Sequence, residues 1–188
     1  LVIRDDRILD LGTSREITAQ YDGDRVIDGE DKLVLPGLID GHGHAGHSLL
    51  KSLGLHNENW YKACEVIYSR ASTEAFWEVD ALLTNLERLR FGTTCGVTFF
   101  GGGDSVMRID DPLYAERHCS GVKKVGVRTF LAVVPRRPPY PRRYSSWNGL
   151  ARSDKMVDFD DMLENTRTII DGCHCSGDGR INIAIMFP

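Results

Sequence analysis

The chain has 188 residues, with 23 lysines and arginines against 27 aspartates and glutamates, and a formal net charge of −4. This length favours one domain with a small appendage, and the mildly acidic balance provides no basic field for nucleic acid. Apolar runs fall far short of the roughly 18 residues of a membrane helix. Charges interrupt the first ten residues, and the five cysteines are irregularly spaced. We therefore expect a soluble cytoplasmic protein with reduced thiols that binds neither nucleic acid nor membranes.

The first 32 residues predict a small β unit. An apolar start, a turn at Asp5-Asp6 and a second apolar segment ending at Gly12 are typical of paired strands. The segment that follows repeats this pattern, with turn signals at Gly23 and Gly29. These residues include too few apolar side chains to form a hydrophobic core of their own. We therefore expect residues 1–32 to pack on another part of the protein.

From residue 33 the chain predicts alternating buried strands and amphipathic helices. The run KLVLPGLID over residues 32–40 is a continuous apolar strand candidate that ends before Gly41. A helix is predicted over residues 73–90, since apolar residues recur at helical spacing, Thr73 suits its N-cap and Gly92 its end. The next run, GTTCGVTFF, is typical of a buried strand.

The second half of the chain continues this alternation. Asp111-Pro112 predicts the start of a helix that runs towards Gly121, and VRTFLAVV predicts a third strand. The segment PRRPPYPRRYSSW is predicted to be a loop, because proline cannot donate to a strand ladder. A helix over residues 159–171 and a fourth strand, RINIAIMF, follow. The order of strands and helices predicts an α/β fold with a parallel sheet covered by helices.

Two histidines directly follow the first predicted strand. His42 and His44 lie at i and i+2, and in extended backbone such side chains point the same way, so both imidazoles can bind one ion. Imidazole is a common zinc ligand and also suits iron and nickel. Gly41 precedes His42 and Gly43 lies between the two histidines, and both glycines leave room for a substrate. The alternative is a polar loop with unrelated histidines, but the preceding apolar strand favours a metal.

The residues around this pair resemble a known signature. VLPGLIDGHGH, followed by SLLKSLG, resembles the apolar-Pro-Gly-apolar-apolar-Asp-x-His-x-His pattern of the amidohydrolase superfamily. The preceding strands resemble the N-terminal half of that superfamily's small β-sandwich, and LERLRFGTTCGVTF resembles its second-strand segment. GVRTFLAVV and DGRINIAIMFP resemble the third and fourth strands of its deaminase and chlorohydrolase branch. The resemblance thus covers essentially the whole chain as an N-terminal portion.

This resemblance implies a partial (β/α)8 barrel of the TIM type. Residues 33–188 would supply its first four strands, and residues 1–32 part of the small β-sandwich. His42 and His44 would be the first two ligands of one divalent ion, Zn²⁺ first and Fe²⁺ as the alternative. Water on such an ion loses a proton and attacks a ring carbon, so the implied activity is deamination of a small heterocyclic substrate.

The chain departs from the superfamily pattern at its end. The resemblance places a third metal histidine and an acid–base glutamate after the fifth strand, another histidine after the sixth, and a metal-binding aspartate after the eighth. This chain ends at the fourth strand. We therefore assign no catalytic residue and expect a fragment that is inactive alone, because catalytic zinc normally has three protein ligands. The unpaired sheet edges lead us to expect a homo-oligomer.

Two further residues are candidates for binding the substrate. His47 lies three residues after His44, and faces either the substrate or solvent. Trp60 either lines the pocket mouth, as Tyr61 would, or packs the following helix.

Other segments are weaker candidates for a metal-binding or ligand-binding site. Cys173-His174-Cys175 lies between a helix end and a strand start and has no Cys-x-x-Cys partner, which argues against a second metal. His56-Asn57-Glu58 imitates another zinc deaminase fold but lacks the downstream Pro-Cys-x-x-Cys. The GGGD loop from Gly101 lacks the spacing of a phosphate-binding loop. For the arginines of PRRPPYPRR, three interpretations stay open: contact with an anionic group of the substrate, contact with a neighbouring subunit, or exposure to solvent alone.

Two alternative functions stay open. A cyclic-amide hydrolase of the hydantoinase or dihydroorotase type would carry two metals and a carboxylated lysine at the fourth strand, and INIAIMFP contains no lysine. A non-catalytic fragment or pseudoenzyme would fold and associate without activity. The missing ligands favour this reading for the polypeptide, whereas the intact His-x-His favours a hydrolase for the parent protein.

Overall fold

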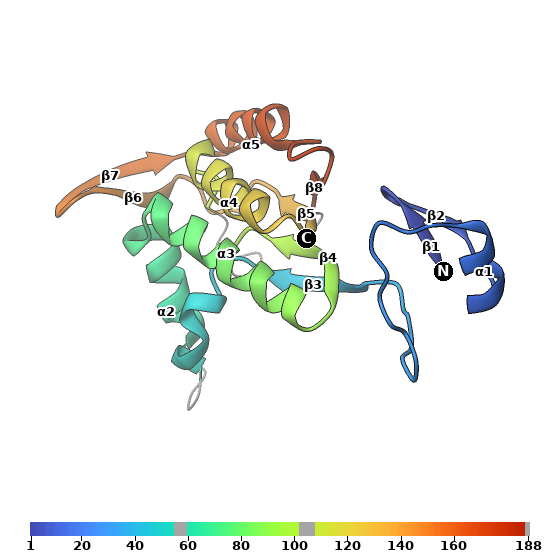
Figure 1. Ribbon diagram of the computed structural model, residues 1–188. Helices are drawn as coiled ribbons and strands as arrows, with labels where there is room; N and C mark the ends of the chain where they lie inside the picture. Colours follow the sequence, from blue (N-terminus) through green and yellow to red (C-terminus); the bar gives the residue numbers. More distant parts are fainter. Residues whose placement is uncertain (55–59, 102–107, 187–188) are drawn as a thin grey trace. The chain divides into compact units, whose positions relative to one another are not determined.

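The computed structural model describes residues 1–54, 60–101 and 108–186, which fall into two compact units, Leu1–Pro36 and Gly37–Pro188. In the first unit, β1 (Val2–Arg4) and β2 (Arg7–Asp10) form an antiparallel hairpin (Figure 1). Its turn holds Asp5 in the left-handed conformation, with a φ of 55°. The helix α1 (Ser14–Gln20) follows, begun by a capping box between Thr13 and Glu16.

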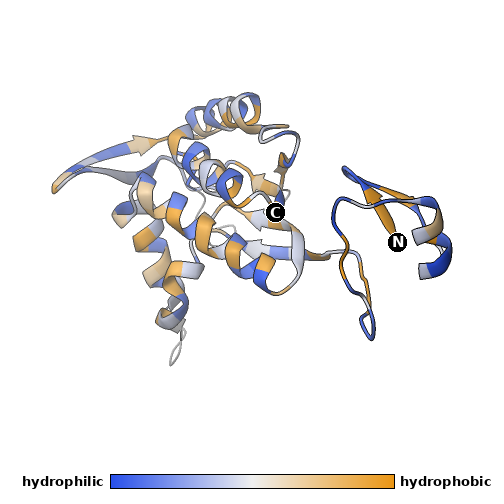
Figure 2. Ribbon diagram, viewed as in Figure 1, coloured by the Kyte–Doolittle hydropathy of each residue, from blue (hydrophilic) through white to orange (hydrophobic). Residues whose placement is uncertain are grey.

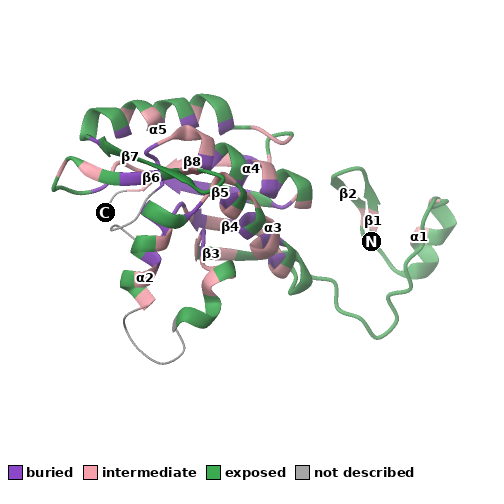
Figure 3. Ribbon diagram, turned by 90° about the vertical axis from the view of Figure 1, so that its left-hand side faces the viewer, coloured by how far each residue is buried: buried purple, intermediate pink, exposed green. Residues whose placement is uncertain are grey.

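The first unit has no buried residue, as the green colouring of its ribbon shows (Figure 3). Ile3, Ile8 and Val26 are each more than 60% exposed. Two expectations for this region were wrong. A helix stands where only strands and turns were predicted, because the Thr13–Glu16 capping box was overlooked. The later segment, residues 22–36, forms no strand, and at Glu30 the backbone N–H bonds locally to Asp28 instead.

The second unit is built on a parallel sheet with the strand order β3-β4-β5-β8. Its strands are β3 (Leu38–His44), β4 (Thr93–Phe99), β5 (Arg128–Val133) and β8 (Ile181–Ile185). The connecting helices α3 (Glu74–Arg90), α4 (Pro112–Val125) and α5 (Phe159–Cys173) lie side by side and cover one face of the sheet (Figure 1). We call the other face the open face. The predicted mixed α/β fold with a parallel sheet is confirmed, although β3 begins six residues later than expected.

The helices begin where the sequence provides caps. Thr73 accepts the N–H of Phe76 at the start of α3, Asp111 caps α4, and Asp158 forms a capping box at α5. Hydrophobic and hydrophilic residues alternate along all three helices (Figure 2), as expected for helices that bury one face. The predicted end of α4 near Gly121 was wrong. The helix continues to Val125, and Gly126, with a φ of 85°, ends it.

The core of this unit lies between the helices and the sheet. Trp77, Leu131, Met162 and Ile169 are fully buried there, and the buried segments in Figure 3 follow the sheet and the helix faces towards it. Between β3 and α3 the chain forms a 3-10 helix (Ser48–Gly54), α2 (Trp60–Val66) and a π-helical turn (Ile67–Ala71). No helix in the described part of the chain is both long and apolar enough to cross a bilayer.

A second hairpin corrects the prediction of a loop over residues 135–147. β6 (Arg142–Asn148) and β7 (Ala151–Val157) pair antiparallel along their whole length. The last proline of the segment is Pro141, so every residue from 142 onwards can donate to a ladder. Asn148-Gly149, with Gly149 at a φ of 60°, is a hairpin-turn signal that the prolines obscured.

Candidate metal centre

A β-bulge near the end of β3 directs the two predicted metal histidines. Asp40 lies opposite Gly96 of β4 and His44 lies opposite Phe99, so four steps along β3 match three along β4. The extra residue reverses the alternation of side chains. Asp40 points towards the helices, whereas the imidazoles of His42 and His44 lie 4.7 and 5.3 Å from the Phe99 ring, measured between ring centres. Both histidines are thus at the carboxyl end of β3.

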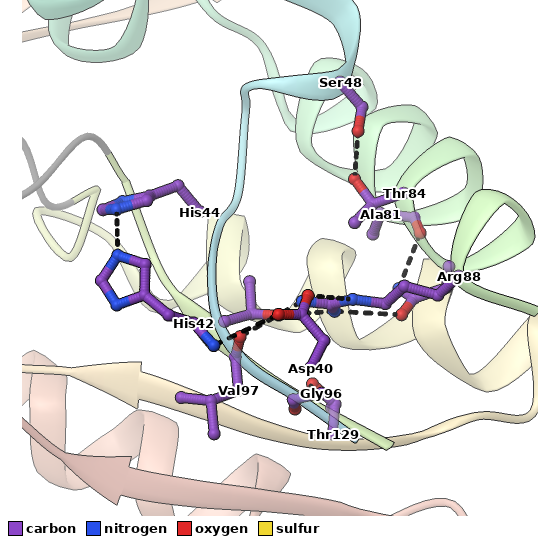
Figure 4. Close-up of polar contacts among 12 residues, drawn as sticks. Asp40, His42, His44, Ser48, Ala81, Thr84, Arg88, Gly96, Val97 and Thr129 are labelled. Carbon is purple, nitrogen blue, oxygen red and sulfur yellow. Dashed lines mark hydrogen bonds and ion pairs between the residues drawn. The ribbon is translucent and has the colours of Figure 1, made fainter. Parts of the chain in front are cut away.

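The two imidazoles converge on one point. The Nε2 atoms of His42 and His44 are 3.0 Å apart (Figure 4). The Nδ1 of His44 lies 2.8 Å from the carbonyl oxygen of Gly101. Because a carbonyl oxygen only accepts, Nδ1 carries the proton, and Nε2 of the neutral ring presents its lone pair. A carbonyl that holds the far nitrogen of an imidazole is the usual support of a metal-binding histidine.

The pair fits two ligands of a divalent ion. Zinc bound tetrahedrally by two imidazoles at 2.0–2.1 Å separates their nitrogens by about 3.3 Å, so a small side-chain movement would admit the ion. In the described ranges, no group of three or more His, Cys, Asp or Glu side chains is arranged to hold a metal. The described residues therefore supply a two-histidine half-site.

The predicted substrate-binding residues lie beside this pair. His47 stacks on His44 with ring centres 5.0 Å apart, and Trp60 meets His47 edge-on at 5.7 Å. The hydroxyl of Tyr68 is 2.7 Å from Nδ1 of His47, a contact that the sequence analysis missed. Burial, assisted by the neighbouring His44, lowers the pKa of His47 and favours its neutral form. The proximity is established, whereas contact of His47 or Trp60 with a substrate stays a prediction.

Arg88 is a second residue that the sequence analysis missed. It reaches from α3 into the sheet, where Nε and Nη2 lie 3.0 and 2.8 Å from Oδ2 of Asp40 (Figure 4). Burial raises the pKa of Asp40, but hydrogen bonds from Arg88 and from the His42 N–H outweigh it and hold that pKa below its ordinary value. An arginine in an amphipathic helix is ordinarily solvated, so its spacing alone did not predict this contact.

The weaker candidates stay outside this centre. At Cys173-His174-Cys175, Nδ1 of His174 accepts the backbone N–H of Ile183, Cys173 is buried and Cys175 is exposed. Residues 56–58 and residues 102–104 of the GGGD segment lie outside the described residues. Of the arginines in the proline-rich segment, Arg136 is buried, and Arg143 forms an ion pair with Asp154 on the hairpin.

Comparison with known proteins finds deaminases among the relatives. The 5-methylthioadenosine/S-adenosylhomocysteine deaminase of Nitratidesulfovibrio vulgaris is 31% identical over 113 residues, 59% of this chain and 26% of the relative. The enzyme of that name from Thermoanaerobacter pseudethanolicus is 27% identical over 191 residues, 98% of this chain and 36% of the relative. The 5'-deoxyadenosine deaminase of Methanobrevibacter smithii is 25% identical over 97% of this chain and 36% of the relative. No model of a protein family matches the chain.

Two solved structures with a similar fold are hydrolases. A triazine hydrolase from Arthrobacter aurescens superposes with a TM-score of 0.51 at 17% identity, over 80% of this chain and 34% of the hydrolase. An atrazine chlorohydrolase from Arthrobacter aurescens, complexed with zinc, gives a TM-score of 0.52 at 18% identity over the same shares. At such identity the likeness concerns the fold. The chain spans about a quarter to a third of the length of the relatives it matches.

Proposed function

The deaminase relatives and hydrolase neighbours indicate the amidohydrolase superfamily, and from this premise we propose that the chain supplies the metal-binding first half of a hydrolase that deaminates a heterocycle. The convergence of the His42 and His44 Nε2 atoms at the carboxyl end of β3 carries this proposal. In α/β barrels the strand ends at this side of the sheet hold the reacting groups. The names of the relatives favour an adenosine derivative as the substrate.

His42 and His44 would hold one divalent ion, Zn²⁺ first, since a structural neighbour is complexed with zinc. A zinc ion bound there would lower the pKa of a water ligand to near neutrality. Deamination replaces the exocyclic amine of the ring with the oxygen of water and releases ammonia. His47 and Trp60 form an aromatic wall next to the histidines, which suits a flat heterocycle, and we propose that they contact it.

Two structural proposals accompany this function. The four parallel strands with helices on one face suit the first half of a (β/α)8 barrel. The first unit suits part of a small β-sandwich, because its apolar residues are exposed and a second layer of such a sandwich would bury them. A cyclic-amide hydrolase receives less support, since β8 contains no lysine to carboxylate.

Elemental analysis of bound metal tests the proposal. We expect the wild-type chain to bind zinc or iron, and the His42→Ala/His44→Ala variant to lose it. We expect the 188-residue polypeptide to release no ammonia from aminated purine nucleosides, because two histidines leave a catalytic zinc one ligand short. A wild-type chain with no metal above the level of the variant would refute the metal centre.

A further inference from the structure

We propose that Arg88 is a positioning residue for the metal centre: with Asp40 it holds the bulge of β3 in the register that brings His42 and His44 together. The inference rests on the proposed function only in assigning an ion to these two histidines. The contacts that hold the bulge are between protein groups alone, so they are open to a separate test.

The Arg88 guanidinium ties the two strands together at the point where their register shifts. Besides Oδ2 of Asp40 on β3, it reaches two groups on β4. Nη1 donates to the hydroxyl of Thr98 at 2.8 Å, and Nη2 donates to the carbonyl oxygen of Val97 at 3.2 Å. The bulge lies between Asp40 and Gly43, opposite Val97. One buried cation therefore bonds to both sides of the irregular step.

Asp40 passes this constraint to the first metal histidine. Its Oδ2 atom accepts from Arg88, and its Oδ1 atom accepts the backbone N–H of His42 at 3.2 Å (Figure 4). Two guanidinium N–H groups donate to Oδ2 and the His42 amide donates to Oδ1, so both carboxylate oxygens are held in place. The His42 backbone is thus fixed within the bulge. Without Arg88, the half-exposed Asp40 side chain would be free to turn into water and release the His42 amide.

Two glycines make room for the guanidinium. A Cβ atom at Gly43 would lie 2.6 Å from Nη2 of Arg88, and one at Gly96 would lie 2.5 Å from Cζ. Gly43 separates the two metal histidines, and we had expected it to leave room for a substrate. In the structure its free side faces Arg88 instead. The glycine of the His-Gly-His triplet therefore accommodates the positioning residue.

Zinc affinity tests this role in the full 188-residue chain. We expect Arg88→Met to weaken Zn²⁺ binding at least tenfold in calorimetric titrations, and Arg88→Lys to recover only part of the loss, because an ammonium does not reproduce the planar set of donors. Arg90→Met, at an exposed position of the same helix, is the matched control and should bind zinc like the wild type. Circular dichroism verifies that each variant is folded. If Arg88→Met unfolds, Asp40→Asn replaces it, since Asn keeps an acceptor for the His42 amide but loses the ion pair.

A second measurement needs no metal. In the wild type we expect the His42 amide to exchange slowly with solvent, and long-range ¹H–¹⁵N spectra to show His44 protonated at Nδ1. Arg88→Met should speed the exchange of the His42 amide while amides in β5 stay protected. Wild-type zinc affinity together with wild-type His42 exchange in the folded variant would overturn the inference. A wild-type chain that binds no zinc would refute the proposed metal centre instead, and the exchange rates would then decide the role of Arg88.

Discussion

At the scale of single residues, His118 of α4 is unusual because it is a fully buried titratable group. It packs edge-on against Phe100, with ring centres 5.6 Å apart. Neither ring nitrogen has a hydrogen-bond partner among the described residues. Burial, and to a lesser degree the charge of Arg88, lowers the pKa of His118 to about 3. The folded protein therefore keeps this imidazole neutral.

This burial predicts a pH-dependent stability. An unfolded histidine titrates near pH 6.5, so between pH 6.5 and about 3 the unfolded chain binds a proton that the folded chain excludes. The free energy of unfolding is therefore not reduced by this group above pH 6.5. It falls as the pH drops below 6.5, with a slope approaching about 1.4 kcal/mol per pH unit. Urea unfolding at pH 7.5, 6.5 and 5.5 measures it. The non-titrating His118→Gln variant is the reference, and a wild-type-minus-variant difference that is flat with pH would contradict the prediction.

At the scale of elements, α3 and α4 approach closely at Gly121. A Cβ atom at this position would lie 2.4 Å from the carbonyl oxygen of Glu78 and 2.9 Å from Cβ of Ala81, both on α3. The glycine is therefore a packing residue inside α4, where its low helix propensity is tolerated for the contact that it permits.

We expect Gly121→Ala to destabilise the protein by about 1–3 kcal/mol, because the helices must move apart to admit the methyl group. Gly172→Ala is the matched control: this helical glycine of α5 has no atom within 4 Å of an added Cβ. It should leave stability unchanged or raise it by up to about 1 kcal/mol. Urea unfolding of both variants decides, and a similar shift in both would mean that helix propensity, not packing, governs position 121.

Gly121 also shows which elements the sequence allowed us to predict. Local signals sufficed for the start of α3 at Thr73 and of α4 at Asp111, because caps and periodicity lie within a few residues. The end of α4 was wrong, since a glycine required by a neighbouring helix looks in the sequence like one that ends a helix. The superfamily resemblance rests on the His-x-His context; the relatives reported above are deaminases, and the structural neighbours share the fold.

The geometry of the site could be predicted only in part from local sequence signals. The i, i+2 spacing predicted that His42 and His44 converge, and they do. The bulge that turns both histidines away from the side of Asp40 depends on the register with β4, and the Arg88–Asp40 contact joins residues 48 positions apart. Such contacts depend on the packed sheet and leave no local pattern in the chain.

At the scale of the whole molecule, the parallel sheet has a free edge at β3 in the described residues, since β3 pairs with β4 alone. At the other edge, the backbone N–H groups of Ile181 and Ile183 on β8 already bond to the Ser176 carbonyl and to His174. Ile39 on β3 is 74% exposed, and Phe130 on the open face is 44% exposed. Unpaired N–H and C=O groups beside exposed apolar side chains favour pairing with another chain. This arrangement agrees with the expectation of a homo-oligomer, which stays a prediction.

We expect sedimentation analysis to show a concentration-dependent dimer, with twice the 21.0 kDa of the single chain. We expect association to use the free edge at β3, so Ile39→Lys should shift the equilibrium to the monomer, because a charge on an edge strand opposes pairing. Leu150 lies in the turn between β6 and β7 and is 98% exposed. Leu150→Lys is therefore the matched control and should leave the monomer–dimer equilibrium unchanged. A monomer at every concentration would contradict the prediction. Equal effects of the two lysines would show that association does not use the β3 edge.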